Sequence, residues 1–83
     1  MEKINVVGLR GVSFDDEKTG RTVSGTSVFY TMEADNVAGL MAGKIFVSAQ
    51  QRDSLDYFPN VGEQCWVDYN RYGKVSRFER IGK

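Results

Sequence analysis

The stretch Thr22-Val-Ser-Gly-Thr-Ser-Val-Phe-Tyr-Thr-Met32 decides the fold class of this 83-residue chain. From residue 26 onward two sets of side chains alternate: Thr26, Val28, Tyr30 and Met32 against Ser27, Phe29 and Thr31. Successive side chains of a β-strand point to opposite faces, so this period of two predicts a strand. We place the strand at Thr22–Met32.

The amino-acid composition favours further strands over helices. Val, Ile, Thr, Phe, Tyr and Trp number 27, whereas Ala, Leu and Met number 10. β-Branched and aromatic side chains fit a pleated, half-buried surface and lose rotamer freedom in a helix. We therefore expect four more strands, at Lys3–Phe14, Lys44–Ser48, Gln64–Asn70 and Val75–Ile81.

Glycines and polar residues mark the connections between these strands. Gly8 and Gly11 interrupt the first strand and would let it bend sharply. Asp15–Gly20 is expected to form a polar turn, and Asn70–Gly73 a hairpin turn with its glycine in the left-handed region. Ala49–Tyr57 has helical spacing and predicts a short helical turn.

The last strand has an unusual pattern. Val75, Phe78 and Ile81 repeat every three residues, which neither a flat strand nor a long helix predicts. The strong hairpin signal before Val75 favours a bulged strand. A short C-terminal helix is the alternative.

Together these elements predict an all-β protein. Five short strands, a curved first strand and one helical turn after the third strand match a small OB-like barrel. An SH3-like barrel is the alternative, because it has the same number of strands and similar turns. We expect residues 1–83 to form a single domain, since two domains would each be too small to build a core.

The inventory of reactive side chains argues against an enzyme. The chain has no histidine, and its single cysteine, Cys65, can form neither an internal disulfide nor a cysteine-cluster zinc site. We expect Cys65 to be a buried structural thiol. The acidic run Asp15-Asp16-Glu17 lacks the alternating oxygen ligands of a calcium loop. We therefore expect no catalysis, no metal, no cofactor and no small-molecule substrate.

The chain begins with Met1 and shows no secretory leader and no apolar run long enough to span a membrane. We expect a cytoplasmic protein that does not enter a membrane. Lys plus Arg and Asp plus Glu are both 11, so the formal net charge is zero and a polycationic coat of the histone kind is excluded.

Positive charge is concentrated near the C-terminus. Within 69–83 a single acid, Glu79, accompanies five cations: Arg71, Lys74, Arg77, Arg80 and Lys83. Aromatic residues, among them Tyr72, are interleaved with them. Single-stranded nucleic acid needs cations to follow its phosphates and rings on which bases stack. The same pattern is also typical of a solvated strand face, so the residues alone leave both interpretations open.

Several segments, taken in order, resemble a known group of proteins. They are Arg21-Thr-Val-Ser-Gly-Thr26, Phe29-Tyr-Thr31, Gly43-Lys-Ile-Phe-Val-Ser48, Val61-Gly-Glu63 and Tyr69-Asn-Arg-Tyr-Gly-Lys-Val75. They resemble small proteins of phages and conjugative elements of Gram-positive bacteria, which look like relatives of the single-stranded-DNA-binding protein of filamentous phages. The resemblance implies an OB-type barrel that dimerises and coats single-stranded DNA without a cofactor.

By position, the resemblance implies DNA contacts at the first hairpin, on the barrel face and at the last hairpin. The residues are Lys18 and Arg21, then Tyr30 and Lys44, then Arg71, Tyr72 and Lys74. With Arg77 and Arg80 from the basic segment, they form the predicted nucleic-acid site. The chain departs from the family at the first hairpin, whose tip reads Lys18-Thr-Gly-Arg21 without an aromatic residue.

An alternative function is a protein-interaction barrel that acts as an accessory or regulatory protein of a phage or mobile element. In that case Tyr57, Phe58 and Tyr72 would form a hydrophobic contact patch, and the cations would be its solubilising rim.

Overall fold

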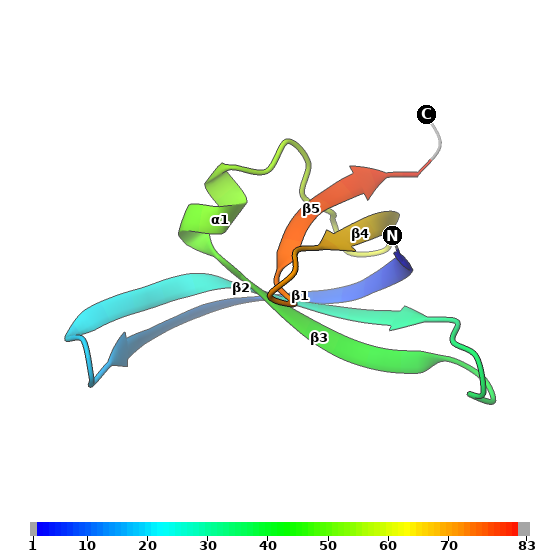
Figure 1. Cartoon of the computed structure of the whole chain (residues 1–83), viewed down its shortest axis with the longest axis horizontal. Helices are drawn as coiled ribbons and strands as arrows, with labels where there is room; N and C mark the ends of the chain where they lie inside the picture. Colours follow the sequence, from blue (N-terminus) through cyan, green and yellow to red (C-terminus); the bar gives the residue numbers. More distant parts are fainter. Residues whose placement is uncertain (1, 82–83) are drawn as a thin grey trace.

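The computed structural model describes residues 2–81 and contains five β-strands and one short helix. The elements are β1 (Glu2–Asp16), β2 (Arg21–Met32), β3 (Met41–Ser48), α1 (Ala49–Asp53), β4 (Gln64–Tyr69) and β5 (Val75–Arg80). Two long hairpins extend in opposite directions from a central crossing, and β4 and β5 lie above it beside α1 (Figure 1). The prediction of an all-β chain with one short helix is confirmed.

The strands form one antiparallel sheet in the order β3-β2-β1-β4-β5. The two outermost strands, β3 and β5, do not pair with each other within residues 2–81. A closed barrel requires such a pairing, so the structure confirms the five-stranded sheet but not its closure into a barrel.

β1 takes part in two pairings because it is long and bends. Its first residues, Glu2–Asn5, pair with β4, and the rest of the strand pairs with β2. Between these parts the register shifts: Val6 pairs with Tyr30 and Gly8 pairs with Phe29, so Val7 is an extra residue. A bulge bends its strand and increases the local twist. The bend predicted near Gly8 is therefore present.

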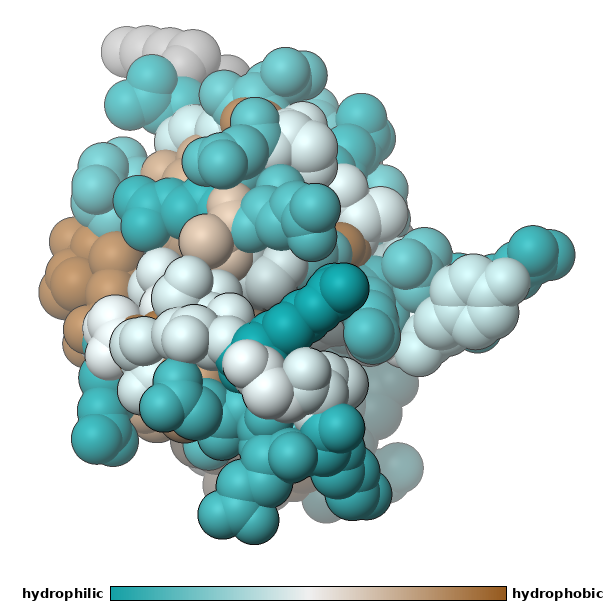
Figure 2. Space-filling model, turned by 90° about the vertical axis from the view of Figure 1, so that its left-hand side faces the viewer, coloured by the Kyte–Doolittle hydropathy of each residue, from teal (hydrophilic) through white to brown (hydrophobic). Residues whose placement is uncertain are grey.

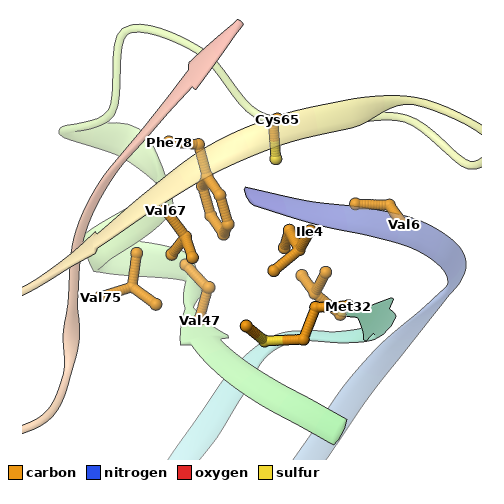
Figure 3. Packing of buried hydrophobic residues seen from close by; sticks show 9 residues of the cluster. Ile4, Val6, Met32, Val47, Cys65, Val67, Val75 and Phe78 are labelled. Atoms are coloured by element: carbon orange, nitrogen blue, oxygen red, sulfur yellow. The ribbon is translucent and has the colours of Figure 1, made fainter. Parts of the chain in front are cut away.

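The core lies between the two halves of this coiled sheet. All strands contribute buried side chains: Ile4, Val6, Val28, Met32, Val47, Cys65, Val67, Val75 and Phe78. Figure 3 shows side chains of this cluster gathered from all five strands, with Met32 from β2 beside Val47 from β3. Phe78 is the only aromatic ring among them, which suits the narrow space inside so small a sheet.

Helix α1 lies at the gap between the edge strands β3 and β5. It begins after Ser48, whose side-chain oxygen accepts a hydrogen bond from the backbone N–H of Gln51 at 3.1 Å. The Gln51 side-chain amide donates to the carbonyl oxygen of Val75 on β5. α1 directly follows β3, so it joins the two edges that backbone pairing leaves separate.

The predicted elements differ from the observed ones mainly at their ends. β3 begins at Met41 rather than Lys44, and the helix ends at Asp53 rather than Tyr57. The last segment is a bulged strand, as the hairpin signal favoured, and not a helix. Asp68 pairs with Arg77 and Tyr69 with Val75, which leaves Ser76 as the extra residue.

The bulge at Ser76 also explains the three-residue repeat. An extra residue between Val75 and Phe78 lets both side chains reach the same core, where they are 3% and 4% exposed.

In the described part of the chain, no helix is long and apolar enough to cross a membrane.

Candidate functional site

The structure distributes the predicted site residues over separate parts of the sheet. Lys18 and Arg21 lie at the β1–β2 turn, and both are exposed. This turn has a defined shape, because the backbone N–H of Lys18 donates to Oδ1 of Asp16 at 2.9 Å and Gly20 adopts a positive φ of 69°. The hairpin therefore presents both cations at its tip, beside the acidic side chain of Asp16.

Tyr30 and Lys44 do not share a face, contrary to the sequence-based expectation. Tyr30 pairs with Gly43 and Phe29 pairs with Lys44, so the two expected contact residues point to opposite sides of the sheet. The Tyr30 ring packs against the core, and its hydroxyl lies over Gly43. Lys44 is exposed on the other side, which we call the outer face.

The β4–β5 turn does bring its predicted residues together. The Asn70 side-chain oxygen accepts hydrogen bonds from the backbone N–H of Tyr72 at 2.9 Å and of Lys74 at 3.1 Å. The Arg71 guanidinium lies 5.1 Å from the centre of the Tyr72 ring, which is 73% exposed. The turn thus holds a cation and a ring side by side in solvent, with Lys74 next to them.

Arg77 and Arg80 have carboxylate partners. Arg77 lies 3.3 Å from both Asp68 and Glu79, and Arg80 lies 3.9 Å from Glu63. These exposed pairs add little to stability, but they neutralise much of the positive charge that the sequence places on β5. The basic segment is therefore less positive at β5 than the residue count indicates.

On the outer face, Lys44 lies in a group of residues whose other members the sequence analysis missed. This group surrounds a groove lined by Arg10, Ser27, Phe29, Lys44 and Phe46, together with Gly11–Ser13 of β1. We call it the outer groove. Arg10 pairs with Ser27, which in turn pairs with Phe46, and Gly8 pairs with Phe29, which pairs with Lys44. The alternation of Ser27 and Phe29 against the buried residues of β2 was the signal that pointed to this face.

Rings and cations alternate in the outer groove above a floor of small residues. Ser27 is only 6% exposed and forms the floor, whereas Phe46 is 41% exposed. Phe46 and Phe29 are diagonal neighbours on adjacent strands, a relation that separates side chains by about 7–8 Å. Toward the hairpin tip, Phe14 continues the same face and is 51% exposed.

The electrostatic surroundings of the outer groove are positive. In residues 8–14, 22–32 and 41–48, which build this part of the sheet, Arg10 and Lys44 are the only charged side chains. Neither forms an ion pair with another residue of the described chain. Viewed toward the β1–β2 tip, the molecule is largely hydrophilic, with hydrophobic side chains gathered along one side (Figure 2).

Two titratable groups outside the lining of the outer groove, Cys65 and Tyr57, have raised pKa values. Burial raises the pKa of the Cys65 thiol to about 11, and its side chain is fully buried, as expected. Burial and a hydrogen bond to Glu63 raise the pKa of Tyr57 to about 12. Within residues 2–81, His, Cys, Asp and Glu side chains do not gather into a group of three that can hold a metal ion.

The three residues of the alternative contact patch, Tyr57, Phe58 and Tyr72, differ in exposure. Tyr57 and Phe58 are half-buried and pack against the core, with the Phe58 ring edge-on to Phe78 at 5.5 Å. Tyr72 is 73% exposed at the β4–β5 turn.

Comparisons with known proteins add no family assignment. No protein-family model matches the chain, and neither a curated protein nor a solved structure matches it.

Proposed function

We propose that this protein binds single-stranded nucleic acid, with little sequence preference and without catalysis, through the outer face of β1, β2 and β3. Phe46 and Phe29 offer flat rings to two neighbouring bases, and Arg10 and Lys44 neutralise the phosphates beside them. Base–ring stacking contributes about 1–3 kcal/mol per base and accepts any base, because every base has a flat π-face.

The observation that carries this proposal is the alternation of rings and unpaired cations on a face without acids. A solvated sheet face usually carries cations and acids together, whereas here Arg10 and Lys44 flank Phe29 and Phe46 with no carboxylate among them. Exposed aromatic rings gathered on a single face mark an interaction site, and nucleic-acid bases can stack on such rings.

The topology supports the same surface by analogy. In OB folds, which are five-stranded, partly open barrels, oligonucleotides bind the face of strands 2 and 3 and the loops that follow strands 1 and 4. In this chain those loops are the β1–β2 turn with Lys18 and Arg21 and the β4–β5 turn with Arg71–Lys74. The proposed site therefore keeps the predicted turn residues and adds the outer groove between β1 and β3.

The test is the salt dependence of oligo-dT binding, measured by fluorescence anisotropy of a labelled oligonucleotide. Each phosphate contact on a single strand contributes about −0.7 to the slope of log affinity against log salt. Lys44→Ala is expected to lower affinity on every sequence and to reduce the slope by about 0.7. Phe46→Leu is expected to lower affinity by up to about 3 kcal/mol with an unchanged slope, because a ring contributes stacking but no charge.

Val61→Ala is the control, because Val61 is 59% exposed in the connection before β4, outside the strands and turns of the proposed site, and should leave binding unchanged. Binding that prefers the single strand to the duplex and depends on Lys44 and Phe46 would support the proposal. An absence of oligonucleotide binding at low salt would overturn it.

A protein-interaction surface is the second candidate function, and the β2–β3 loop favours it. Val37, Leu40 and Met41 are 41%, 55% and 36% exposed and lie in a segment without charged residues. Clusters of exposed apolar side chains mark contact surfaces. Leu40→Ser should then abolish binding of a protein partner and leave oligo-dT affinity unchanged. Phe46→Leu should lower oligo-dT affinity and leave binding of the protein partner unchanged.

From the resemblance to filamentous-phage proteins, we also propose that the protein acts as a homodimer. Sedimentation equilibrium tests this point directly. A mass equal to that of one 9.3 kDa chain at micromolar concentration would contradict it.

A further inference from the structure

A second cleft lies on the inner face of the β1–β2 hairpin, between this hairpin and helix α1. We call it the inner cleft. It is lined by Gly11–Ser13 of β1, by Ser24–Thr26 of β2, and by Ala49 and Arg52 of α1. Its polar groups are the guanidinium of Arg52 and the hydroxyls of Ser13, Ser24 and Thr26. No carboxylate lines it among the described residues.

The Arg52 guanidinium is held in place from two sides. One of its terminal nitrogens, Nη1, donates to Oγ1 of Thr26 at 3.3 Å. The guanidinium also lies 4.2 Å from the centre of the Phe58 ring, which itself packs edge-on against the buried Phe78. An arginine has five N–H donors in a planar fork, and only the one to Thr26 is committed to a described partner. The remaining donors are free to bind an anion without a loss of side-chain freedom.

Small residues keep the inner cleft open. Ser13 pairs with Ser24, and Gly11 pairs with Thr26, so these residues form two successive rows on the same face. An added Cβ on Gly11 would meet nothing within 4 Å. Short hydroxyl side chains and an empty position at glycine leave room for a tetrahedral oxyanion beside the guanidinium.

We propose that the inner cleft binds a phosphate group, and that this phosphate belongs to the strand that occupies the outer groove. The inner cleft and the outer groove are both lined by Gly11–Ser13, so they meet at β1. Within residues 2–81, no strand pairs with the other side of β1 along this stretch, since β4 pairs with Glu2–Asn5. A single strand therefore passes over the free edge of β1 from the outer groove to Arg52. This step rests on the proposed function, whereas the anion site itself does not.

The experiment uses two probes and a charge-reversing variant. Ser24→Asp places a carboxylate beside Arg52, and Ala38→Asp adds the same charge in the exposed β2–β3 loop at the opposite end of the molecule (Figure 1). Inorganic phosphate is titrated into each protein, and amide chemical shifts of Gly11, Ser13 and Ser24 are followed by NMR. Affinity for a short and a long oligo-dT is measured in parallel by anisotropy.

We expect phosphate to shift these amides in the wild type and in Ala38→Asp but not in Ser24→Asp. Because a hydrogen bond between charged groups is lost, Ser24→Asp should weaken the long oligo-dT about tenfold more than Ala38→Asp does. The short oligo-dT, which fills only the outer groove, should bind both variants equally. Gly11→Val, which fills the cleft without adding charge, should reproduce the loss on the long oligonucleotide.

The possible failures are distinguishable. If the wild type binds oligo-dT and Ser24→Asp binds it as tightly as Ala38→Asp, the phosphate site of the strand is overturned and the proposed function stands. If no oligonucleotide binds but phosphate still shifts the cleft amides, the anion site stands and its ligand is a free phosphate compound. If phosphate shifts none of these amides, the anion site is overturned.

Discussion

The ring of Phe46 lies over the backbone of Gly25 on the adjacent strand. A Cβ built on Gly25 would stand 2.6 Å from Cζ of Phe46 and 2.4 Å from the carbonyl oxygen of Val47, closer than such atoms approach. Only glycine leaves this space free. The tip of the Phe46 ring therefore lies close to the sheet at Gly25, while Phe46 remains 41% exposed.

Replacing Gly25 by alanine is expected to damage both stability and binding. The new methyl group meets the backbone of β3 as well as the Phe46 ring, so the β2–β3 pairing must shift. Overpacking of this kind costs about 1–3 kcal/mol, which urea unfolding followed by circular dichroism will detect. Oligo-dT affinity should fall with it, because the ring loses its position.

Gly43→Ala is the matched comparison. A Cβ on Gly43 would stand 2.6 Å from the hydroxyl oxygen of Tyr30, which is the far end of a side chain that can move. We expect a smaller loss of stability than for Gly25→Ala and unchanged oligo-dT affinity, since Tyr30 is on the inner face. Equal losses of affinity in the two variants would show that Phe46 has no special role.

The β4–β5 hairpin provides a prediction about charge. Arg71 and Lys74 form no ion pair within residues 2–81, whereas Arg77 is paired with Asp68 and Glu79. Arg71→Ala and Lys74→Ala should each reduce the salt slope of oligo-dT binding by about 0.7, because each removes one phosphate contact. Arg77→Ala should change the slope less, since its charge is already neutralised. A larger effect for Arg77 than for Arg71 would contradict the proposed placement of the site.

Tyr72 tests stacking at the same hairpin. Tyr72→Ala is expected to weaken oligo-dT binding by about 1–3 kcal/mol without a change in the salt slope, because the exposed ring carries no charge. The measurement is anisotropy at two salt concentrations. A fall in slope would mean that the variant also displaced Arg71, which lies against the ring.

The sequence was sufficient to predict the fold class because its information is local. The period of two in Thr22–Met32 and the glycines at the turns act within a few residues of one another. The sequence did not predict that β3 and β5 are unpaired within residues 2–81, or that Gln51 of α1 donates a hydrogen bond to Val75. Contacts between residues far apart in the chain leave no periodic signal.

The candidate site shows the same limit. Lys18 and Lys74 were predicted because charged residues can be identified directly in a sequence. Arg77 was predicted in the same way, but its ion pair with Asp68 offsets its charge. Phe46 was missed, because a phenylalanine in a strand is usually in the core. Only the register, which places Phe46 opposite Ser27 on the outer face, separates it from the buried residues.

The buried thiol of Cys65 provides a probe of unfolding. Its side chain is fully buried and its pKa is raised to about 11, so at pH 8 it is neither accessible nor ionised in the folded protein. We expect no reaction with a thiol reagent such as DTNB until urea unfolds the chain, after which one thiol per chain reacts. Rapid reaction of the folded protein would show that β4 opens locally under native conditions.

Glu63 links the α1–β4 connection to β4 and β5. Its Oε1 accepts hydrogen bonds from the backbone N–H of Asn60 at 2.7 Å and from the Tyr57 hydroxyl at 2.8 Å, and Oε2 lies 3.9 Å from Arg80. These contacts, the backbone hydrogen bond first, hold the pKa of Glu63 below its ordinary value of 4.5. The folded protein therefore prefers the ionised carboxylate.

A group whose pKa is lowered by folding stabilises the protein above its unfolded pKa and loses this contribution as the pH falls through its folded pKa. Glu63 should thus contribute its full stabilisation at pH 7, and the urea midpoint of the wild type should decrease below about pH 4.5 as this carboxylate takes up a proton. Glu63→Gln removes the titration and should flatten this part of the acid transition, at the cost of a lower midpoint at pH 7. Glu17→Gln, in the exposed β1–β2 turn, is the control and should keep the wild-type profile. If the Gln variants at both positions follow the same curve as the wild type, the hydrogen bonds at Glu63 do not govern acid stability.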